Sequence, residues 1–340
     1  MIETDNLLIE MHSQPLASAA PEPTLSAMMR KLLIFLLVLL LAGAALIVFL
    51  GWAEQRPRVH YLSDLRSELI SEPPPQGVHG NLLAIRPQLF PLDYQSPAHL
   101  RLKLAAALDH ARTGGLLNRK TLVVLPEHIG TWLLATGEKA EFYRARDRVE
   151  VRNWLLLGNP VLALEVLLQN LDADRLDEAL LRMKAERMAE DYQTLFGGLA
   201  RDYGITLLAG SILLPEPRIE AGRLKSGDGP LRTISLVFGP DGHIVGKPYR
   251  EDWPWEWRTS EVQDVRVAGL HYRVERNWQP GWPQSQVQLP DGRSSAPLFL
   301  RGRLSWPIGG APRSVELTPQ QAPQASQAPG SHLLNQWVMP

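Results

Sequence analysis

The sequence predicts a mixed α/β domain that follows one transmembrane helix. Three observations lead to this prediction: an uncharged apolar run near the N-terminus, a strand, helix and buried strand between residues 81 and 127, and a long helical stretch followed by a hairpin. Strand, helix and strand in this order are typical of a βαβ unit, and such units build α/β layers. At 340 residues the chain can bury one large core or two small ones.

The apolar run predicts a membrane anchor. Residues 32–52 contain no charge and no proline, and about 20 apolar residues suffice to cross a bilayer core. A buried core helix is the alternative, but such helices usually have a polar face. The run is longer than the apolar part of a signal peptide and lacks a small-x-small cleavage site, so we expect an uncleaved helix over residues 30–52.

The flanking charges predict the orientation of this anchor. Arg30 and Lys31 directly precede the run, which favours a cytoplasmic N-terminus by the positive-inside rule, although Arg56 and Arg58 on the other flank reduce the bias. We therefore expect a single-pass protein of the inner membrane whose domain lies on the periplasmic or extracytoplasmic side. Residues 1–29, which are polar and poor in aromatic residues, read as a disordered tail.

The first elements of the domain follow a proline-rich stretch. Residues 53–80 contain three successive prolines at 73–75 and little periodicity, which is typical of a stiff tether. Residues 81–85 read as a strand. Ser96 and Pro97 begin a helix that extends to about residue 112, because serine caps helix N-termini and proline suits the first turn. Residues 121–127 form an apolar run typical of a buried central strand.

A helical region and a hairpin complete the predicted domain, which covers residues 81–267. Leucine and methionine recur near helical spacing between residues 140 and 202. A strand follows at residues 204–210. Residues 233–238 and 243–245 then read as the two arms of a hairpin whose turn contains Pro240, Asp241 and Gly242.

The composition changes after Ala268. Residues 268–340 are rich in Pro, Gln, Ser and Arg, and we expect this divergent segment to be poorly ordered. Residues 298–300 form one candidate strand, and residues 318–331 read as a low-complexity tail. The abrupt change leaves open that the reading frame departs from the ancestral one near Ala268.

Charge and cysteine content exclude several classes of function. The chain carries 35 Lys and Arg against 36 Asp and Glu and shows no basic patch, so we expect no nucleic-acid partner. It contains no cysteine, which excludes disulfides, thiolate metal sites and thiol nucleophiles. We expect neither a metal nor a cofactor.

Three segments resemble landmarks of the nitrilase (carbon-nitrogen hydrolase) superfamily, in the same order along the chain. They are residues 122–127, which end in Pro126-Glu127, residues 204–212, which contain Gly210-Ser211, and residues 237–246 around the hairpin turn. The resemblance covers roughly residues 81–257. It implies an α-β-β-α sandwich, four-layered if complete.

The resemblance also implies roles for individual residues. Glu127 matches the glutamate that the family uses as general base. Lys247 is the one lysine near the position where the family has its catalytic lysine. The ungapped match to that position falls on Arg250, whose planar guanidinium is not a simple replacement for an ammonium. Glu256 matches a second glutamate that braces that lysine, and its Trp-rich surroundings equally suit an interface. The alternative for Glu127 is a strand-end glutamate that faces solvent or forms a salt bridge with an arginine.

The family nucleophile is missing, since a cysteine is expected after the lysine segment. Ser260, Ser285 and Ser305 lack the context of a nucleophile elbow and read as surface or turn residues. We therefore expect a membrane-anchored carbon-nitrogen hydrolase-like protein that is inactive as written, a pseudoenzyme with a binding or scaffold role.

Two alternatives remain open. One is an active amidase, nitrilase or acyltransferase with a substituted nucleophile or a misread C-terminal frame. The other is a tethered structural protein unrelated to nitrilases. Beside the membrane, the partners implied by the resemblance are a small amide or nitrile ligand and a second copy of the chain in a homo-oligomer.

Overall fold

The computed structural model describes residues 25–56, 60–76, 80–169, 173–253, 262–279, 282–302, 304 and 329–339. The chain divides into two compact units, Met1–Trp52 and Ala53–Pro340. Helix α1 (Leu25–Glu54) forms the described part of the first unit, and its last two residues begin the second.

Helix α1 has the length and composition of a membrane-spanning helix. Residues Met28–Glu54 form one helix whose most apolar window is 0% buried within the protein. This agrees with the predicted apolar helix, which begins five residues earlier than expected, at Leu25. Signal sequences share these properties, so the sidedness of the helix and its retention stay predictions. Of the tail predicted over residues 1–29, residues 1–24 lie outside the described residues, and residues 25–29 belong to α1.

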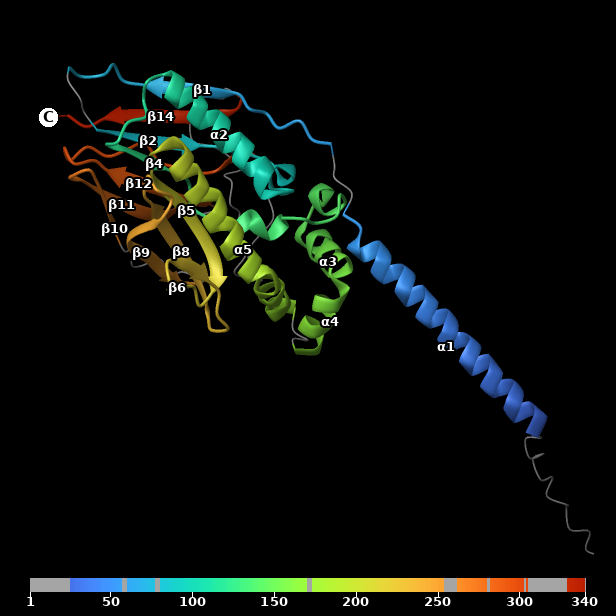
Figure 1. Cartoon of the computed structure of the whole chain (residues 1–340). Helices are drawn as coiled ribbons and strands as arrows, with labels where there is room; N and C mark the ends of the chain where they lie inside the picture. The colour runs from blue at the N-terminus through green and yellow to red at the C-terminus, as the bar shows by residue number, and fades with distance from the viewer. Residues whose placement is uncertain are drawn as a thin grey trace, which may run out of the picture. The chain divides into compact units, whose positions relative to one another are not determined.

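A seven-stranded mixed sheet forms the centre of the second unit (Figure 1). Its spatial order is β1 (Ser67–Ser71), β14 (Ser331–Trp337), β2 (Asn81–Arg86), β4 (Thr121–Val124), β5 (Thr206–Pro215), β8 (Leu231–Phe238) and β9 (Ile244–Asp252). Strands β2, β4 and β5 are parallel to one another, and every residue in them is buried. This explains their continuous apolar sequence, since parallel strands are covered on both faces.

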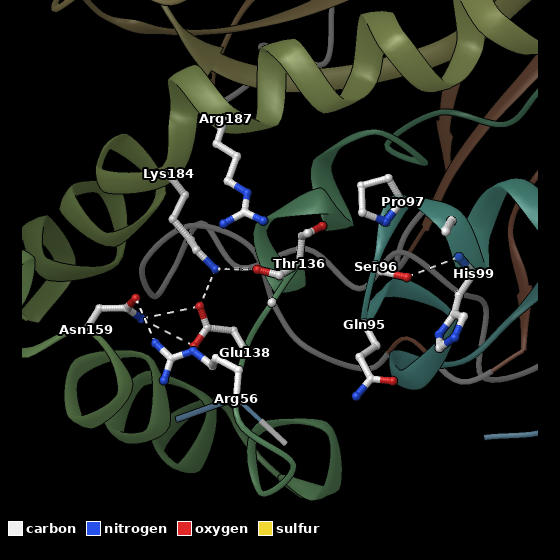
Figure 2. Close-up of a pocket in the computed structure, with 12 residues that line it drawn as sticks. Arg56, Gln95, Ser96, Pro97, His99, Thr136, Glu138, Asn159, Lys184 and Arg187 are labelled. Atoms are coloured by element: carbon white, nitrogen blue, oxygen red, sulfur yellow. Dashed lines mark hydrogen bonds and ion pairs between the residues drawn. The ribbon is translucent and has the colours of Figure 1, made fainter. Parts of the chain in front are cut away.

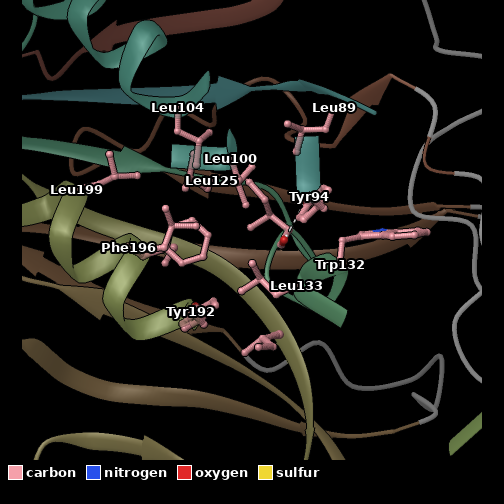
Figure 3. Close-up of a cluster of buried hydrophobic side chains, with 14 of the residues drawn as sticks. Leu89, Tyr94, Leu100, Leu104, Leu125, Trp132, Leu133, Tyr192, Phe196 and Leu199 are labelled. Atoms are coloured by element: carbon pink, nitrogen blue, oxygen red, sulfur yellow. Dashed lines mark hydrogen bonds between the residues drawn. The ribbon is translucent and has the colours of Figure 1, made fainter. Parts of the chain in front are cut away.

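Two long helices cover one face of this sheet. Helices α2 (Pro97–Thr113) and α5 (Ala173–Tyr203) contribute to a single apolar core with the sheet. Figure 3 shows the middle of this core, where aromatic rings of α5 meet leucines of α2 and of the segment that follows β4. Ser96 caps α2 by accepting a hydrogen bond from the backbone N of His99, as the sequence predicted.

A second, three-stranded sheet covers the other face. It consists of β10 (Gln263–Val267), β11 (Leu270–Gln279) and β12 (Trp282–Gln288) in antiparallel order. Its inward residues, including Val265, Tyr272 and Val287, pack on residues of the central sheet such as Leu122 and Val237. The described residues thus build a helix, sheet and sheet sandwich. The second helical layer of the expected α-β-β-α sandwich is not among their elements.

Shorter elements connect these layers. The 3-10 turns are η1 (Pro91–Tyr94), η2 (Thr131–Ala135) and η3 (Phe142–Arg144), and the remaining helices are α3 (Arg148–Gly158) and α4 (Pro160–Gln169). Two small sheets pair β3 (Gln88–Leu89) with β13 (Arg301–Gly302) and β6 (Arg218–Glu220) with β7 (Arg223–Lys225). Helices α3, α4 and α5 occupy most of the region predicted to be helical.

The structure differs from the sequence prediction at both ends of the domain. Residues 53–80, expected to be a tether, supply the edge strand β1. Residues 268–340, expected to be poorly ordered, supply β11, β12 and the sheet strand β14. Strands β11 and β12 were missed because buried and more accessible positions alternate along them, and β14 was missed because its buried residues include the polar Ser331, His332 and Asn335.

The remaining C-terminal predictions have mixed outcomes. The strand expected at 298–300 is a single bridge between Leu298 and Ser285. Most of the expected low-complexity tail, residues 318–328, lies outside the described residues. Strand β14 pairs with β1 on one side and β2 on the other, so the chain as written returns to the sheet after Ala268.

Candidate functional site

The loop after β4 is fixed against β5 by a glycine. Strand β5 shifts register between Leu208 and Ser211, and Gly210 at this bulge has φ 65°. A Cβ atom on Gly210 would lie 2.0 Å from the carbonyl oxygen of Pro126. Only glycine lets the two backbones approach so closely. Two of the three segments that resemble nitrilases therefore contact each other directly.

His128 turns the chain sharply after Glu127. Its φ is 58°, an uncommon value for a residue with a side chain. The backbone N of His128 donates to Oγ of Ser211 at 2.8 Å, and its Nδ1 lies 2.9 Å from Oγ1 of Thr131. Burial, and to a lesser degree the charge of Arg276, lower the pKa of His128 to about 3. The imidazole is therefore neutral at physiological pH.

Glu127 forms a buried ion pair with Arg276 of β11. The arginine Nε donates to Oε1 of Glu127 at 2.9 Å, and the two side chains are 3% and 5% exposed. Nη2 of Arg276 donates to Oε1 of Gln263 on β10 at 2.7 Å. The carboxylate thus lies between the two sheets, held by a residue from the segment that the sequence suggested was poorly ordered.

Tyr249 of β9 also contacts Arg276. The guanidinium carbon of Arg276 lies 3.7 Å from the centre of the Tyr249 ring, a cation–π arrangement. The Tyr249 hydroxyl donates to Oε2 of Glu251 at 2.6 Å. Burial and this hydrogen bond raise the pKa of the Tyr249 phenol well above its ordinary value. Arg276 is consequently surrounded by Glu127, Gln263 and Tyr249, here called the Arg276 cluster.

The predicted site residues have different positions relative to this cluster. Glu127 is part of it. Lys247 and Arg250 are exposed on β9, and the β9 residue that reaches Arg276 is Tyr249, whose side chain points to the opposite face from Arg250. Glu256 lies outside the described residues.

Three buried hydroxyls lie beside the cluster. Ser285, expected at the surface or in a turn, is 1% exposed on β12 directly across from Arg276. Ser235 on β8 is 0% exposed and pairs with Tyr249, and Thr233 lies two residues earlier. The side-chain oxygens of all three have no hydrogen-bond partner within the described protein. Ser260 and Ser305 lie outside the described residues.

The ion pair occupies one oxygen of the Glu127 carboxylate. A general base needs a lone pair within hydrogen-bond reach of the proton it removes, and Oε1 of Glu127 already accepts from Arg276. The described residues contain no group of three or more His, Asp or Glu side chains that could hold a metal ion.

Sequence reasoning missed Arg276, Tyr249 and Gln263. Alternation along β11 was the available signal, because Arg276 is in phase with the buried residues Tyr272 and Val274. A buried arginine needs hydrogen-bonded or oppositely charged partners, and one partner of Arg276 is Glu127. Its distance of 149 residues from Glu127 hides that partner from any local pattern.

Comparisons with known proteins add little to this geometry. No family model matches the chain, and no curated protein matches it. One solved structure, a double mutant of the amidase from Nesterenkonia sp. AN1 in complex with acrylamide, shares 14% identity at a TM-score of 0.27. That similarity covers 59% of this chain and 56% of the amidase chain, so it spans little more than half of either protein.

Proposed function

We propose that this protein is a membrane-anchored, carbon-nitrogen hydrolase-like domain that binds rather than hydrolyses, with Glu127 as a structural residue. One observation carries the proposal: the Glu127 carboxylate is buried in an ion pair with Arg276. The resemblance of residues 122–127, 204–212 and 237–246 supports the type of domain, and the apolar helix α1 supports the anchor.

The chemistry of the resembling family supports the loss of catalysis. That chemistry uses a carboxylate to deprotonate a thiol, whose thiolate attacks an amide or nitrile carbon. The chain contains no cysteine, and a guanidinium is the group bound to Oε1 of Glu127. Removing the nucleophile alone usually lowers turnover by roughly a thousand-fold or more.

The test is hydrolysis of a panel of simple amides and nitriles by the purified full chain and by Glu127→Gln. We expect turnover indistinguishable from the uncatalysed rate in both proteins. Turnover of about 1 per second or faster that Glu127→Gln abolishes would contradict the proposal, because it would require a working base and a substituted nucleophile.

A second candidate function is hydrolysis by a serine nucleophile. The observation in its favour is that the hydroxyls of Ser235 and Ser285 lie beside the Arg276 cluster without a hydrogen-bond partner within the described protein. Against it, both serines lie within strands and are at most 1% exposed, whereas a nucleophile must meet its substrate. Ser235→Ala and Ser285→Ala distinguish the candidates, because only a serine hydrolase would lose turnover in one of them.

A further inference from the structure

The geometry points to a second site, a pocket that binds a phosphate group and lies apart from the Arg276 cluster. The pocket has a volume of about 590 Å³ and lies between the start of α2, the segment after η2, and α5 (Figure 2). This volume is in the range of small-molecule sites. No residue of the Arg276 cluster lines it, so this inference does not depend on whether Glu127 is catalytic.

The lining of the pocket is positively charged. It contains the cations of Arg56, Lys184 and Arg187 and the single carboxylate of Glu138. Lys184 is committed to Glu138, with which it forms a buried ion pair, and it also donates to the carbonyl oxygens of Leu134 and Thr136. Burial, with a further contribution from Arg187 and Arg56, lowers the pKa of Lys184.

Two guanidinium groups are left with little or no neutralising charge. Arg56 donates to the carbonyl oxygens of Ala53 and Gly158 and to Oδ1 of Asn159, all of which are uncharged. Arg187 has a long ion pair with Asp191, at 3.8 Å, and its side chain is 64% exposed. Guanidinium groups suit phosphate because they offer parallel N–H donors to two oxygens.

Unused polar atoms on the pocket wall are the second observation that indicates a ligand. Thr136 is only 3% exposed, and its Oγ1 has no hydrogen-bond partner within the described protein. In Figure 2 this hydroxyl points away from Lys184 and toward the side of Pro97. Nδ1 of His99, on the first turn of α2, is also buried without a partner. Buried polar groups are nearly always bonded, so these atoms indicate a missing partner.

The N-terminus of α2 also favours an anion in the pocket. Ser96, Pro97 and Ala98 line the pocket at the N-terminus of this 17-residue helix. The N-terminus of a helix carries partial positive charge and favours anions. An anion in the pocket would therefore meet Arg187, the Thr136 hydroxyl and the helix start together.

Chain connectivity suggests one source of the phosphate. Arg56 lies two residues beyond Glu54, the last residue of α1. Two residues of chain can separate Arg56 from the end of α1 by no more than about 7 Å. If α1 spans a membrane, Arg56 therefore lies close to the membrane surface. Membrane surfaces present anionic phosphate groups at this level. The phosphate is thus that of a phospholipid headgroup or that of a small soluble phosphate, and the experiment separates the two.

The experiment measures binding by the full chain in a neutral detergent. The probes are glycerol 3-phosphate and a short-chain phosphatidylglycerol, titrated by calorimetry, with lipid adducts counted by native mass spectrometry. We expect saturable binding that weakens about ten-fold or more in Arg187→Gln and in Thr136→Val. Thr136→Val should not lower the melting temperature, because the hydroxyl that it removes has no partner within the described protein.

Arg201→Gln is the matched control. Arg201 also lies on α5, and its side chain is 67% exposed and pairs with a neighbouring aspartate. The Arg201→Gln variant should bind both probes as tightly as the unaltered chain does. Binding of the lipid alone identifies a headgroup, binding of glycerol 3-phosphate alone identifies a soluble phosphate, and equal binding of both probes supports recognition of the phosphate group that they share. Failure of both probes to bind, or equal affinity in Arg187→Gln, Thr136→Val and Arg201→Gln, would overturn the inference.

Discussion

Arg276 donates from Nε to Oε1 of Glu127 across 2.9 Å, which joins the small sheet to the loop that follows a central strand. Both side chains are at most 5% exposed, and the Tyr249 ring covers the guanidinium. A buried ion pair of this kind need not add net stability, because desolvation of both charges opposes their attraction. Removal of one partner is different, since it leaves a buried charge without its counter-ion.

Single substitutions in this pair should therefore destabilise the domain more than the double substitution. We expect Arg276→Met or Glu127→Leu alone to lower the free energy of unfolding by about 3 to 5 kcal/mol. The double variant should recover much of that loss, because no uncompensated charge remains buried. Urea unfolding of the four proteins gives the coupling energy. If the two single losses simply add in the double variant, the pair is not the unit that we describe.

The lowered pKa of His128 predicts that the domain loses stability at acid pH. Its pKa is about 3 in the folded protein and about 6.5 in an unfolded chain. Below pH 6.5 His128 is protonated in the unfolded state but not in the folded state. The free energy of unfolding therefore falls as the pH decreases from about 6.5 toward 3. The maximum slope from one such group is about 1.4 kcal/mol per pH unit.

The measurement for His128 is a difference between two proteins. Unfolding free energies of the unaltered chain and of His128→Gln, taken at pH 7 and pH 5, cancel the contribution of other titrating groups. We expect the stability lost between these pH values to be smaller in His128→Gln, by about 1 to 2 kcal/mol. Equal losses would mean that His128 takes up a proton in the folded protein as readily as in the unfolded chain, which would contradict the lowered pKa.

The sequence predicts the elements that depend on local patterns. The helix after Ser96 and the turn around Asp241 were located to within a few residues because capping and turn chemistry are local, whereas the second hairpin arm, predicted over residues 243–245, extends to Asp252. Strands β11 and β14 were not predicted, although Tyr272 and Val274 alternate with polar neighbours. Their order comes from packing against distant strands, which composition alone does not reveal.

The site could be predicted only in part for the same reason. Glu127 was found because Pro-Glu at the end of an apolar run is a visible pattern. The choice between a base and an arginine-paired glutamate depended on what approaches it from β11, far along the chain. Lys247 was chosen by residue type, yet the β9 residue that contacts Arg276 is Tyr249, and β9 shifts its register against β8 between Val245 and Tyr249.

Gly210→Ala should be strongly destabilising. An added Cβ would lie 2.0 Å from the carbonyl oxygen of Pro126, in a backbone conformation that alanine adopts with difficulty. Gly222→Ala separates the two causes, since Gly222 also has positive φ but has open space around it. We expect Gly222→Ala to cost about 1 kcal/mol and Gly210→Ala at least twice as much. Similar melting temperatures for the two variants would contradict the close approach.

The buried Asp93–Lys103 ion pair joins η1 to α2, and Asp93 also binds Ser63 in the segment before β1. Their charged atoms lie 3.0 Å apart with side chains 0% and 1% exposed, and Oδ1 of Asp93 also accepts from Ser63 at 2.5 Å. We expect Lys103→Met to lower stability by about 3 kcal/mol or more, because the Asp93 carboxyl group would remain buried without its counter-ion. Arg112→Met is the control, since its ion pair with Asp109 is exposed and should cost at most about 1 kcal/mol. Equal effects of the two variants on urea unfolding would argue against the buried pair.

The orientation of α1 gives the last prediction. Arg30 and Lys31 precede the apolar residues of this helix, and positive charges are retained on the cytoplasmic side. A reporter that is active only outside the cytoplasm should therefore be active when fused after Asn118. Replacement of Arg30 and Lys31 by glutamine should lower that activity, because Arg56 and Arg58 would then carry the only nearby charge bias. Replacement of Arg56 and Arg58 should leave it unchanged or raise it. A fusion after Asn118 that behaves as cytoplasmic, or a full chain that high-salt washing releases from membranes, would contradict the anchor and its orientation.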